Sequence, residues 1–521
     1  MQSINFRLLY PFIGITVLSS CESGKKVEQS KPYNIVFIMS DDHTRQMMSC
    51  YDKRHIQTPN LDRIAEGGVI FSNAFVANSL SGPSRACLLT GKHSHKNGKL
   101  DNVTVFDGNQ QTVQKLLQGA GYQTAMIGKW HLDGKPKHFD HWEILPGQGN
   151  YYNPDFITST GIKKYEGYVT DIITDLSLNW LENQRVKNKP FCLFIHHKAT
   201  HRNWMADTTY LRDYEDKTFE LPPNFFDNYE GRIAASQQKM SIYNDMDVVY
   251  DLKMMSDSVR TGLSQTYRDN IYGRMNESQR AVWDKHYLPI IDSFYSSNLQ
   301  GKELAKWKYQ RYMCDYAKVV KSLDENVGRV LDYLEENGLM ENTIVFYTSD
   351  QGFYMGEHGW FDKRFMYEES FSTPLVIHLP RSFKKHGNID ALVQNIDFAP
   401  TMLNLAGAKV PHDMQGISLL PLLKNKETPH NWRKSLYYHY YEYPGEHSVK
   451  RHYGVRTERY KLIHFYNDID AWELYDLQND PNEMYNLYGK EGYEKITKEL
   501  KSELKHLQKK YDDPILTKYP L

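Results

Sequence analysis

Four short apolar segments, each followed at once by polar residues, constrain the fold of this 521-residue chain most strongly. Segments 34–39, 122–127, 191–195 and 343–348 have the length and composition of buried parallel strands. Strands that alternate with helical segments predict a doubly wound α/β sheet, whose ligands bind beyond the carboxyl ends of the strands. We therefore expect the polar clusters that follow these strands to meet at one edge of the sheet: Ser40-Asp41-Asp42, Gly128-Lys129-Trp130-His131, His196 to His201, and Ser349-Asp350-Gln351-Gly352.

The remaining segments predict a helical insertion and a second, smaller sheet. The clearest helix runs from about Tyr312 to Asn337, with its apolar residues on one stripe and Gly338 as its stop. Residues 230–310 are polar, favour helix and carry no strand signal, which indicates an inserted helical segment. Near the C-terminus, short β-like segments precede a charged helix from about Glu491 to Tyr511, which predicts an antiparallel sheet with one helix packed on it. Those segments are 435–440, 453–457 and 460–465.

The first residues predict export. Arg7 precedes an apolar segment, 8–18, that is too short for a membrane-spanning helix. Leu18-Ser19-Ser20-Cys21 is typical of a lipoprotein signal, which makes Cys21 the lipid-bearing N-terminus, and an ordinary secretory signal is the alternative. We expect an exported protein, periplasmic or an outer-membrane lipoprotein, that meets the membrane only through this lipid. The predicted organisation is signal peptide 1–20, tether 21–31, main domain 32–425 and C-terminal subdomain 426–521.

Composition excludes several classes of function. Lys and Arg number 63 against 64 Asp and Glu, so the chain lacks the basic surface of a nucleic-acid-binding protein. A hydrophobic fraction of 40% is sufficient for a large core. The 38 tyrosines suit either sugar-binding surfaces or packing beneath loops. Beyond Cys21, Cys50, Cys87, Cys192 and Cys314 lack metal-site spacing, so we expect buried thiols or at most one or two disulfides.

One segment and two strand ends carry the candidate chemistry. In Ser81-Gly82-Pro83-Ser84-Arg85, Pro83 suits the first turn of a helix, which places Ser81 where free N–H groups favour an anion and Arg85 on the same face. An ordinary capped helix explains the same residues equally well. Asp41, Asp42, Asp350 and Gln351 form an all-oxygen set that suits Ca²⁺ or Mg²⁺ and not zinc, although adjacent aspartates are often only solvated turns.

A set of basic residues completes the predicted site. These residues lie where acid–base groups and anion clamps are expected, at or beyond strand ends: Lys129, His131, His201 and Lys363. A metal, a cationic ring and a helix N-terminus together describe a pocket for a tetrahedral oxyanion, either sulfate or phosphate.

At this point the chain resembles a type I sulfatase of the alkaline-phosphatase superfamily, in its serine-type bacterial branch. The resemblance covers nearly the whole mature chain and implies the alkaline-phosphatase-like fold, with the smaller C-terminal sheet. It rests on these motifs: Ser81-x-Pro83-x-Arg85 with Leu88-Leu89-Thr90-Gly91, Gly128-Lys129-Trp130-His131, Ser349-Asp350-Gln351-Gly352 with Gly356-Glu357-His358-Gly359, and Leu474-Tyr475-Asp476-Leu477 with Asp480-Pro481.

The resemblance implies that a sulfatase-maturing enzyme oxidises Ser81 to formylglycine (3-oxoalanine). The hydrated aldehyde offers one hydroxyl to attack sulfur, and the other then releases sulfate. By the same resemblance, Ca²⁺, in preference to Mg²⁺, is held by Asp41, Asp42, Asp350, Gln351 and the modified Ser81.

The resemblance also implies roles for the basic residues. Arg85 and Lys129 steady the formylglycine, and Lys363 clamps the sulfate. His201 is the acid that protonates the leaving alcohol, and His131 is the base in the elimination. One departure stands out, because Thr200 occupies a position where proline is usual.

Three further segments resemble N-acetylglucosamine-6-sulfatases: Asp362-Lys363-Arg364, Tyr151-Tyr152-Asn153 and 97–102. Asp362 and Arg364 would bind neighbouring sugar hydroxyls, or would form only a surface ion pair. His452 would reach over the pocket from the C-terminal subdomain. We expect exo-acting removal of the 6-O-sulfate from N-acetylglucosamine or glucosamine in heparan-type, heparin-type or mucin-type glycans. The alternatives are a sulfatase for another sugar position, a phosphonate or phosphodiester hydrolase of the same fold, and a non-catalytic glycan-binding lipoprotein.

Overall fold

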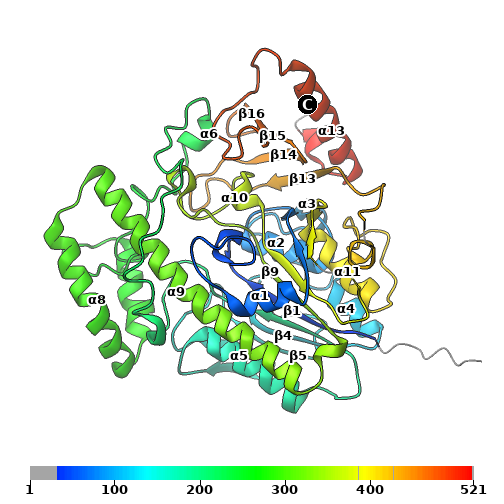
Figure 1. Cartoon of the computed structure of the whole chain (residues 1–521), viewed down its shortest axis with the longest axis horizontal. Coiled ribbons are helices and arrows are strands. Elements are labelled where there is room, and N and C mark those ends of the chain that lie inside the picture. The colour runs from blue at the N-terminus through cyan, green and yellow to red at the C-terminus, as the bar shows by residue number, and fades with distance from the viewer. Residues whose placement is uncertain (1–31, 385–386, 426, 519–521) are drawn as a thin grey trace, which may run out of the picture. The chain divides into compact units, whose positions relative to one another are not determined.

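The four predicted strands are neighbours in the middle of a ten-stranded mixed sheet (Figure 1). The computed structural model describes residues 32–384, 387–425 and 427–518, so the predicted signal peptide, the tether and Cys21 lie outside the described residues. In sheet order the strands are β11 (Gly387–Ile389), β2 (Gly68–Phe71), β10 (Leu375–His378), β9 (Thr343–Ser349), β1 (Asn34–Ser40), β8 (Phe191–His196), β4 (Gln123–Lys129), β5 (His141–Leu145), β6 (Asp155–Thr158) and β7 (Gly161–Lys164).

The central strands run parallel and end level with one another. Strands β9, β1, β8, β4 and β5 pair in parallel, whereas β10, β6 and β7 pair antiparallel with their neighbours. In the register, Ser40 is opposite Ser349, and His196 is opposite both Met39 and Gly128. The expectation that the polar strand ends share one edge of the sheet is therefore confirmed.

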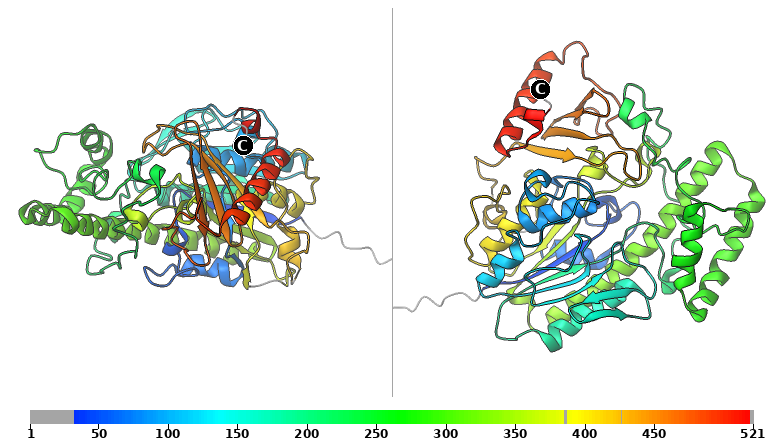
Figure 2. Two further views of the ribbon diagram at one scale, coloured as in Figure 1. Left: turned by 90° about the horizontal axis from the view of Figure 1, so that it is seen from above. Right: turned by 180° about the vertical axis from the view of Figure 1, so that it is seen from behind.

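Alternate residues of each central strand enter two separate cores. Val36 and Ile38 of β1 pack into one core, whereas Ile35 and Phe37 pack into the other, as the two-residue period of a strand requires. The first core is covered by α1 (Pro59–Glu66), α5 (Val169–Asn179) and α9 (Gly301–Glu336), and the second by α2 (Ser81–Thr90), α4 (Val113–Gly119) and α11 (Phe398–Leu405) (Figures 1 and 2).

The segment predicted as a helical insertion contains helices and turns and no strand. Its helices are α6 (Ile233–Ser236), α7 (Gly262–Thr266) and α8 (Glu277–Ser297). Helix α8 begins at a capping box, in which the side chains of Asn276 and Gln279 each accept a hydrogen bond from the other's backbone N–H. Figures 1 and 2 show α8 beside α9 and away from the central sheet. The exact limits of an inserted domain remain a prediction.

A four-stranded antiparallel sheet, β13 to β16, follows near the C-terminus, as predicted. Its strands are β13 (Ser435–Tyr440), β14 (His452–Thr457), β15 (Tyr460–Phe465) and β16 (Ala471–Asp476). Helix α13 (Glu494–Lys510) packs Leu500, Leu504 and Leu507 against Tyr437 and Tyr453 of this sheet. Full burial of each leucine contributes about 1.5–3 kcal/mol.

The remaining elements are short and connect these layers. They are β3 (Ala74–Phe75) paired with β12 (Val393–Gln394), and helices α3 (Ser94–Asn97), α10 (Glu368–Phe371), α12 (Leu420–Lys424) and α14 (Ile515–Lys518). Cys87, Cys192 and Cys314 are buried free thiols, as predicted, and Cys50 is a free thiol that is only partly buried. Among the helices of the described residues, none combines the length and the apolar character needed to cross a membrane.

Candidate active site

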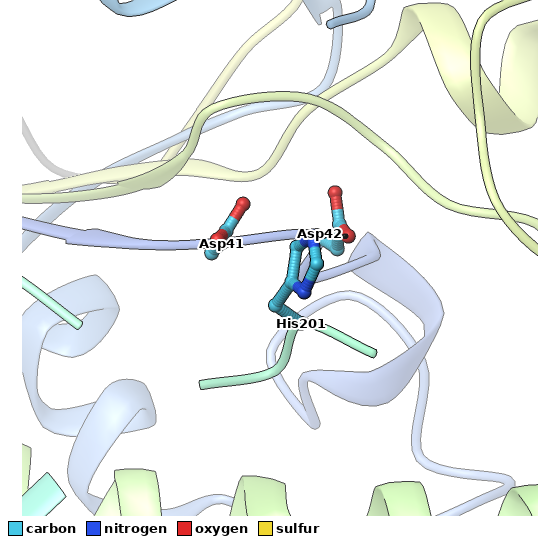
Figure 3. Close-up of side chains that lie close together, drawn as sticks. All are labelled: Asp41, Asp42 and His201. Atoms are coloured by element: carbon cyan, nitrogen blue, oxygen red, sulfur yellow. Dashed lines mark ion pairs between the residues drawn. The ribbon is translucent and has the colours of Figure 1, made fainter. Parts of the chain in front are cut away.

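Asp41, Asp42 and His201 bring their ligand atoms within 4.8 Å of one another at the end of β1 (Figure 3). In a continuing strand, adjacent side chains would point to opposite faces. Asp42 instead has a φ of +66°, so the chain leaves the strand there and both carboxylates enter one cluster. Both aspartates are fully buried. This arrangement was predicted for the aspartates, whereas His201 had been assigned a catalytic role and not a place among potential ligands.

Asp350 and Gln351 approach the same cluster from β9. The backbone N–H of Asp42 donates to Asp350 Oδ1 over 3.1 Å, and Gln351 Nε2 donates to Asp350 Oδ1 over 2.8 Å and to a carboxylate oxygen of Asp42. The oxygen of the same amide, Gln351 Oε1, is buried without a hydrogen-bond partner. A buried acceptor with no donor is costly unless another group satisfies it, and a half-turn of the amide directs this oxygen at the carboxylates. The donor set therefore fits a hard divalent cation.

The crowding of the carboxylates is visible in their pKa values. Burial raises the pKa of Asp42 to about 6 against the effect of Lys363, and burial together with Asp41 raises the pKa of Asp350 to about 6. Burial acts in the same direction on Asp41, but Lys129 leads a group of cations that hold its pKa well below the ordinary value. The negative charges of Asp42 and Asp350 are thus only partly compensated by cations of the protein.

Ser81 is the first residue of α2, with its hydroxyl directed at the acidic cluster. Ser81 Oγ donates to Asp41 Oδ1 over 3.0 Å, and the side chain is only 1% exposed. Arg85, one turn later, donates through Nε and Nη2 to Asp350 Oδ2 over 3.1 and 3.0 Å, which is a charge-assisted two-point contact. The helix ends at Gly91, whose positive φ closes its last turn. The predicted placement of Ser81 and Arg85 on one helical face agrees with this geometry.

The two predicted lysines each pair with one aspartate. Lys129 Nζ contacts Asp41, and Lys363 Nζ lies 2.6 Å from Asp42 Oδ2. Burial lowers the pKa of Lys129. Burial acts in the same direction on Lys363, but Asp42, Asp41 and Asp350 together outweigh it and raise the pKa of this lysine. Arg85 Nη1 also donates to the carbonyl of Lys129 over 2.8 Å. The lysines therefore lie in the same cluster as the acids, as expected.

The two predicted histidines occupy different surroundings. His201 Nδ1 lies 2.6 Å from the carbonyl of Arg202, so this nitrogen carries the proton and Nε2, 3.9 Å from Asp42 Oδ2, faces the cluster as an acceptor. His131 instead contacts Gln148, with 3.3 Å between His131 Nε2 and Gln148 Nε2. Burial, then Lys129, lowers the pKa of both rings well below the ordinary value, which keeps them neutral.

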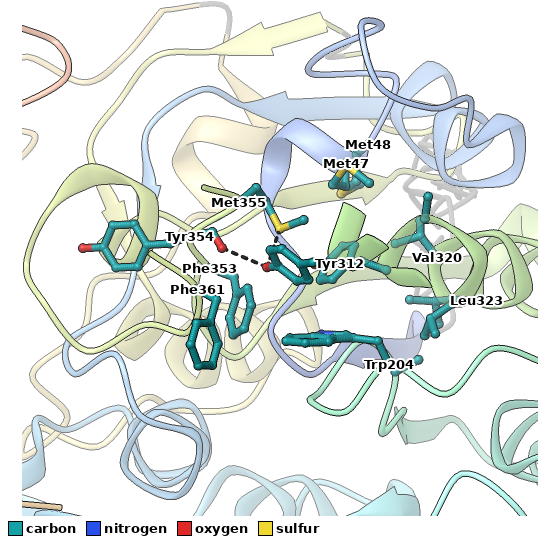
Figure 4. Close-up of a cluster of buried hydrophobic side chains, with 14 of the residues drawn as sticks. Met47, Met48, Trp204, Tyr312, Val320, Leu323, Phe353, Tyr354, Met355 and Phe361 are labelled. Carbon is teal, nitrogen blue, oxygen red and sulfur yellow. Dashed lines mark hydrogen bonds between the residues drawn. The ribbon is translucent and has the colours of Figure 1, made fainter. Parts of the chain in front are cut away.

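One hydrophobic cluster supports the loops that carry these side chains (Figure 4). Trp204, which follows His201, packs against Phe353, which follows Gln351. On α9, Tyr312 contacts Trp204 and Tyr316 stacks with Phe353. The hydroxyl of Tyr316 donates to the carbonyl of Asp42 over 2.7 Å and accepts from Thr200 Oγ1 over 2.8 Å. Thr200, at the position where proline is usual, thus ties the His201 loop to the aspartate turn.

Of the three residues predicted to contact the sugar, Asp362 and Arg364 lie beside Lys363, whereas His452 lies elsewhere. Asp362 and Arg364 flank Lys363, both with positive φ, and form an ion pair, although a buried one and not the surface pair considered above. Arg364 Nε is buried with no hydrogen-bond partner. His452 does not reach the pocket: it is fully buried among aromatic rings, its Nε2 accepts from the backbone N–H of Met366, and its Nδ1 contacts the carbonyl of Lys450. The prediction that His452 contacts the sugar is therefore wrong, because aromatic rings enclose the side chain and both ring nitrogens are bound to backbone groups.

Other residues near the site were not assigned from the sequence. His447 Nε2 lies 3.2 Å from Asp362 Oδ2, and Glu446 pairs with both Arg364 and Arg202. They lie in an irregular loop between β13 and β14, where no periodic pattern marks them. Gln148 follows β5, and the strand-end rule would have found it if His141-Trp142-Glu143-Ile144-Leu145 had been recognised as a strand.

Comparison with known proteins agrees with this geometry. A family model described as "Sulfatase" matches residues 33–408, and one described as "N-sulphoglucosamine sulphohydrolase, C-terminal" matches residues 356–510. The chain is 52% identical over 520 residues to an N-acetylglucosamine-6-O-sulfatase of Bacteroides thetaiotaomicron, which covers 98% of this chain and 92% of the relative.

Two solved structures extend the comparison. One, of a protein in complex with its substrate D-glucosamine-2-N,6-O-disulfate, superposes with a TM-score of 0.89 at 53% identity and covers 93% of this chain and 99% of that one. A phosphonate monoester hydrolase from Silicibacter pomeroyi superposes with a TM-score of 0.68 at 18% identity, covers 93% of this chain and 96% of that one, and shows a shared fold only. On the matched family model and the extended identity, the chain belongs to the sulfatase family, hydrolases of sulfuric esters.

Proposed function

We propose that the chain removes the 6-O-sulfate from terminal N-acetylglucosamine or glucosamine in heparan-type, heparin-type or mucin-type glycans. The observation that carries the proposal is the 52% identity, over almost the whole chain, to an N-acetylglucosamine-6-O-sulfatase. The similar solved structure bound to a 6-O-sulfated glucosamine supports the same substrate class. The fold alone does not separate sulfate from phosphonate esters, because a phosphonate hydrolase shares it.

The same proposal includes a divalent cation held by oxygen ligands. Asp41, Asp42, Asp350, Gln351 and the modified Ser81 would hold Ca²⁺, in preference to Mg²⁺, and the unpartnered Gln351 Oε1 supports this assignment. When bound, the ion would neutralise developing charge on the sulfate oxygens. Lys363, paired with Asp42, would hold the sulfate beside it, and Arg85 with Lys129 would fix the nucleophile through their contacts to Asp350 and Asp41.

We further propose that Ser81 is oxidised to formylglycine by a maturing enzyme. A plain serine would form a sulfate ester without an easy exit, whereas an aldehyde hydrate provides a second hydroxyl for release of sulfate. His201 Nε2 faces the acidic cluster and is unprotonated in the free protein. Binding of the anionic ester would favour uptake of a proton at this nitrogen, which would then pass to the leaving sugar oxygen, and His131 would accept the proton of the second hydroxyl in the release step.

The sugar would be recognised beside the sulfate clamp. The buried pair of Asp362 and Arg364 lies immediately on either side of Lys363, and Arg364 Nε has no partner of its own. We assign Arg364 Nε and Asp362 to sugar hydroxyls, because unpaired buried donors discriminate strongly against a substrate that cannot accept from them. Asp362→Ala is expected to raise KM more than it lowers kcat for N-acetylglucosamine-6-sulfate.

A screen of defined sulfated monosaccharides tests the proposal. Protein made together with a serine-type maturing enzyme, with oxidation of Ser81 verified by mass spectrometry, should release sulfate from the 6-O-sulfates and not from the 2-O-, 3-O- or 4-O-sulfates. Ser81→Ala is the control and is expected to lose about 10⁴–10⁶-fold in kcat. Release from N-acetylgalactosamine-4-sulfate without release from N-acetylglucosamine-6-sulfate would refute the substrate assignment, and turnover of phosphonate monoesters alone would refute the reaction.

Export as a lipoprotein is a separate proposal that rests on Leu18-Ser19-Ser20-Cys21. Metabolic labelling with a fatty acid in the native host should mark the wild-type protein and leave Cys21→Ala unlabelled. Mass spectrometry of a mature N-terminus other than a modified Cys21 would contradict it.

A further inference from the structure

Gln148 connects two groups that the proposed mechanism uses separately. Its Oε1 contacts Lys129 Nζ, and its Nε2 lies 3.3 Å from His131 Nε2. Lys129 in turn pairs with Asp41, which accepts the hydrogen bond from Ser81. A single amide therefore spans the lysine that would orient the nucleophile and the histidine that would act as base.

The backbone around Gln148 is built to hold this amide in place. Gln148 follows β5, whose Leu145 is paired with Lys129 in the parallel register. Gly147 and Gly149, on either side, have φ values of +54° and +69°, which glycine adopts without strain. The ammonium of the buried Lys198 donates to the carbonyl of Gln148 over 3.1 Å. The backbone of Gln148, from which the amide extends, is thus fixed by a strand end, a two-glycine turn and a buried hydrogen bond.

The chemistry of the neighbours dictates which way the amide faces. A lysine ammonium has only donors, so the amide oxygen must point toward Lys129. The amide NH₂ then points toward His131 Nε2, and two donors cannot face each other, so this nitrogen must be the unprotonated acceptor. The ring proton therefore lies on His131 Nδ1, which is buried and has no hydrogen-bond partner.

We propose that Gln148 is a positioning residue that holds His131 as the neutral Nδ1–H tautomer, with the Nε2 lone pair directed to the site, while it orients Lys129. The inference rests on the role proposed above for His131. The 3.3 Å contact is at the long end of the range for a hydrogen bond, so an incoming hydroxyl can displace the amide from the Nε2 lone pair. The charged groups that face this ring are Lys129, Asp41, Arg85 and Lys99, of which three are cations that favour the neutral form.

Two substitutions at this position separate the two contacts. In Gln148→Glu the carboxylate still accepts from Lys129 but donates nothing, so it favours a protonated His131. In Gln148→Ala both contacts are lost. Gln118→Glu is the matched control, because Gln118 is a partly buried glutamine on α4 whose amide donates only to Thr124 Oγ1 over 3.2 Å.

The kinetic readout is the pH profile of kcat with N-acetylglucosamine-6-sulfate. For Gln148→Glu we expect the acid limb to move to higher pH by about one unit or more, the usual effect of an added opposite charge within hydrogen-bond range. For Gln148→Ala we expect kcat to fall by about 10- to 100-fold, at the lower end of a general-base contribution, with KM little changed. An acid limb of Gln148→Glu that coincides with those of the wild type and of Gln118→Glu would overturn the proposal.

A second readout does not depend on turnover. The second measurement is NMR of ¹⁵N-histidine-labelled protein with unmodified Ser81. The ring resonances that are present in the wild type and missing from His131→Asn belong to His131. The wild type should show a neutral ring protonated at Nδ1 near pH 7, and Gln148→Glu should become protonated at both nitrogens at a higher pH than the wild type. A wild-type ring protonated at Nε2 would refute the inference. Wild-type protein inactive on every sulfated sugar would instead refute the proposed function, whatever the tautomer.

Discussion

Two ionic clusters of this protein, each centred on buried aspartates, are built from similar residues and differ in how their charges are compensated. In the candidate active site, Asp41, Asp42 and Asp350 meet the cations of Lys129, Lys363 and Arg85. In the second cluster, called the Asp315 cluster here, Asp315 and Glu215 meet three cations: Lys253, Arg311 and Lys318.

The pKa values of the carboxylates show the difference. Burial acts to raise the pKa of Asp315, but the nearby cations, led by Arg311, together lower it below the ordinary value. Burial leaves the pKa of Asp42 and Asp350 at about 6. In the Asp315 cluster the protein's own cations fully compensate the carboxylates. In the active-site cluster three carboxylates meet three cations, and a bound divalent ion would add two positive charges. Those charges would attract an anionic ester.

Asp42→Asn should damage activity and spare the fold. We expect a loss of about 10³-fold in kcat/KM, the scale of removing one main electrostatic group from an active site. The melting temperature without added metal should stay within about 2 °C of the wild type, because one member of a repelling set has been removed. Sulfate release and calorimetry on the same sample measure both, and unfolding of the variant would show that this cluster stabilises the fold after all.

Asp315→Asn should do the reverse. Breaking a buried pair costs about 3–5 kcal/mol, because charges on Lys253 and Arg311 remain uncompensated. Activity per folded molecule should be unchanged. Since the pKa of Asp315 is lowered in the folded state, its stabilisation is complete above the ordinary value of 3.8 and is lost as the pH falls below it. Urea unfolding at several pH values should show the difference from the wild type shrinking in acid, and a constant difference would contradict this reading.

Removal of the metal tests the contrast without a substitution. A chelator should lower the stability of the wild type by about 2.7 kcal/mol relative to protein with metal at 100 times its Kd. Ca²⁺ should restore it, and Asp42→Asn should respond to neither treatment. A chelator effect of equal size in Asp42→Asn would place the ion elsewhere in the molecule.

The smallest expected effect is on substrate binding by a His452 variant, and it tests whether His452, like Asp362, contacts the sugar. His452→Phe removes the acceptor for the Met366 N–H but keeps a ring among Tyr438 and Phe365, so we expect a loss of about 1–3 kcal/mol in stability. Its KM for N-acetylglucosamine-6-sulfate should equal that of the wild type, unlike that of Asp362→Ala. A raised KM in His452→Phe would restore His452 as a sugar contact.

The centre of the fold and the acidic half of the site could be predicted because both follow from continuous apolar strands. β1, β4, β8 and β9 each contain a continuous apolar segment, and their carboxyl ends meet at one edge because the strands are parallel neighbours. The outer strands were missed because their sequences are mixed, as in the exposed β7 with Gly161-Ile162-Lys163-Lys164. Glu446 and His447 were missed for a related reason, since their loop reaches Asp362 only through the docking of the second sheet.

Two tyrosines near the site show why composition alone could not assign a role to the 38 tyrosines. Tyr151 and Tyr152, placed in a segment that resembles a sugar-binding one, are buried and donate to the carbonyls of His201 and Ala206. Composition alone left both uses of tyrosine open, and for these two residues the contacts decide in favour of packing beneath the site.

The burial of Ser81 has a consequence for how the protein is made. At 1% exposure, and enclosed by α2, β1 and β9, its side chain is out of reach of another protein once the chain has folded. An enzyme that oxidises this serine must therefore act while the segment is still extended. With Ser81 oxidised as proposed, the time between synthesis of residue 81 and closure of the sheet by β9, more than 250 residues later, would set the fraction of molecules that become active.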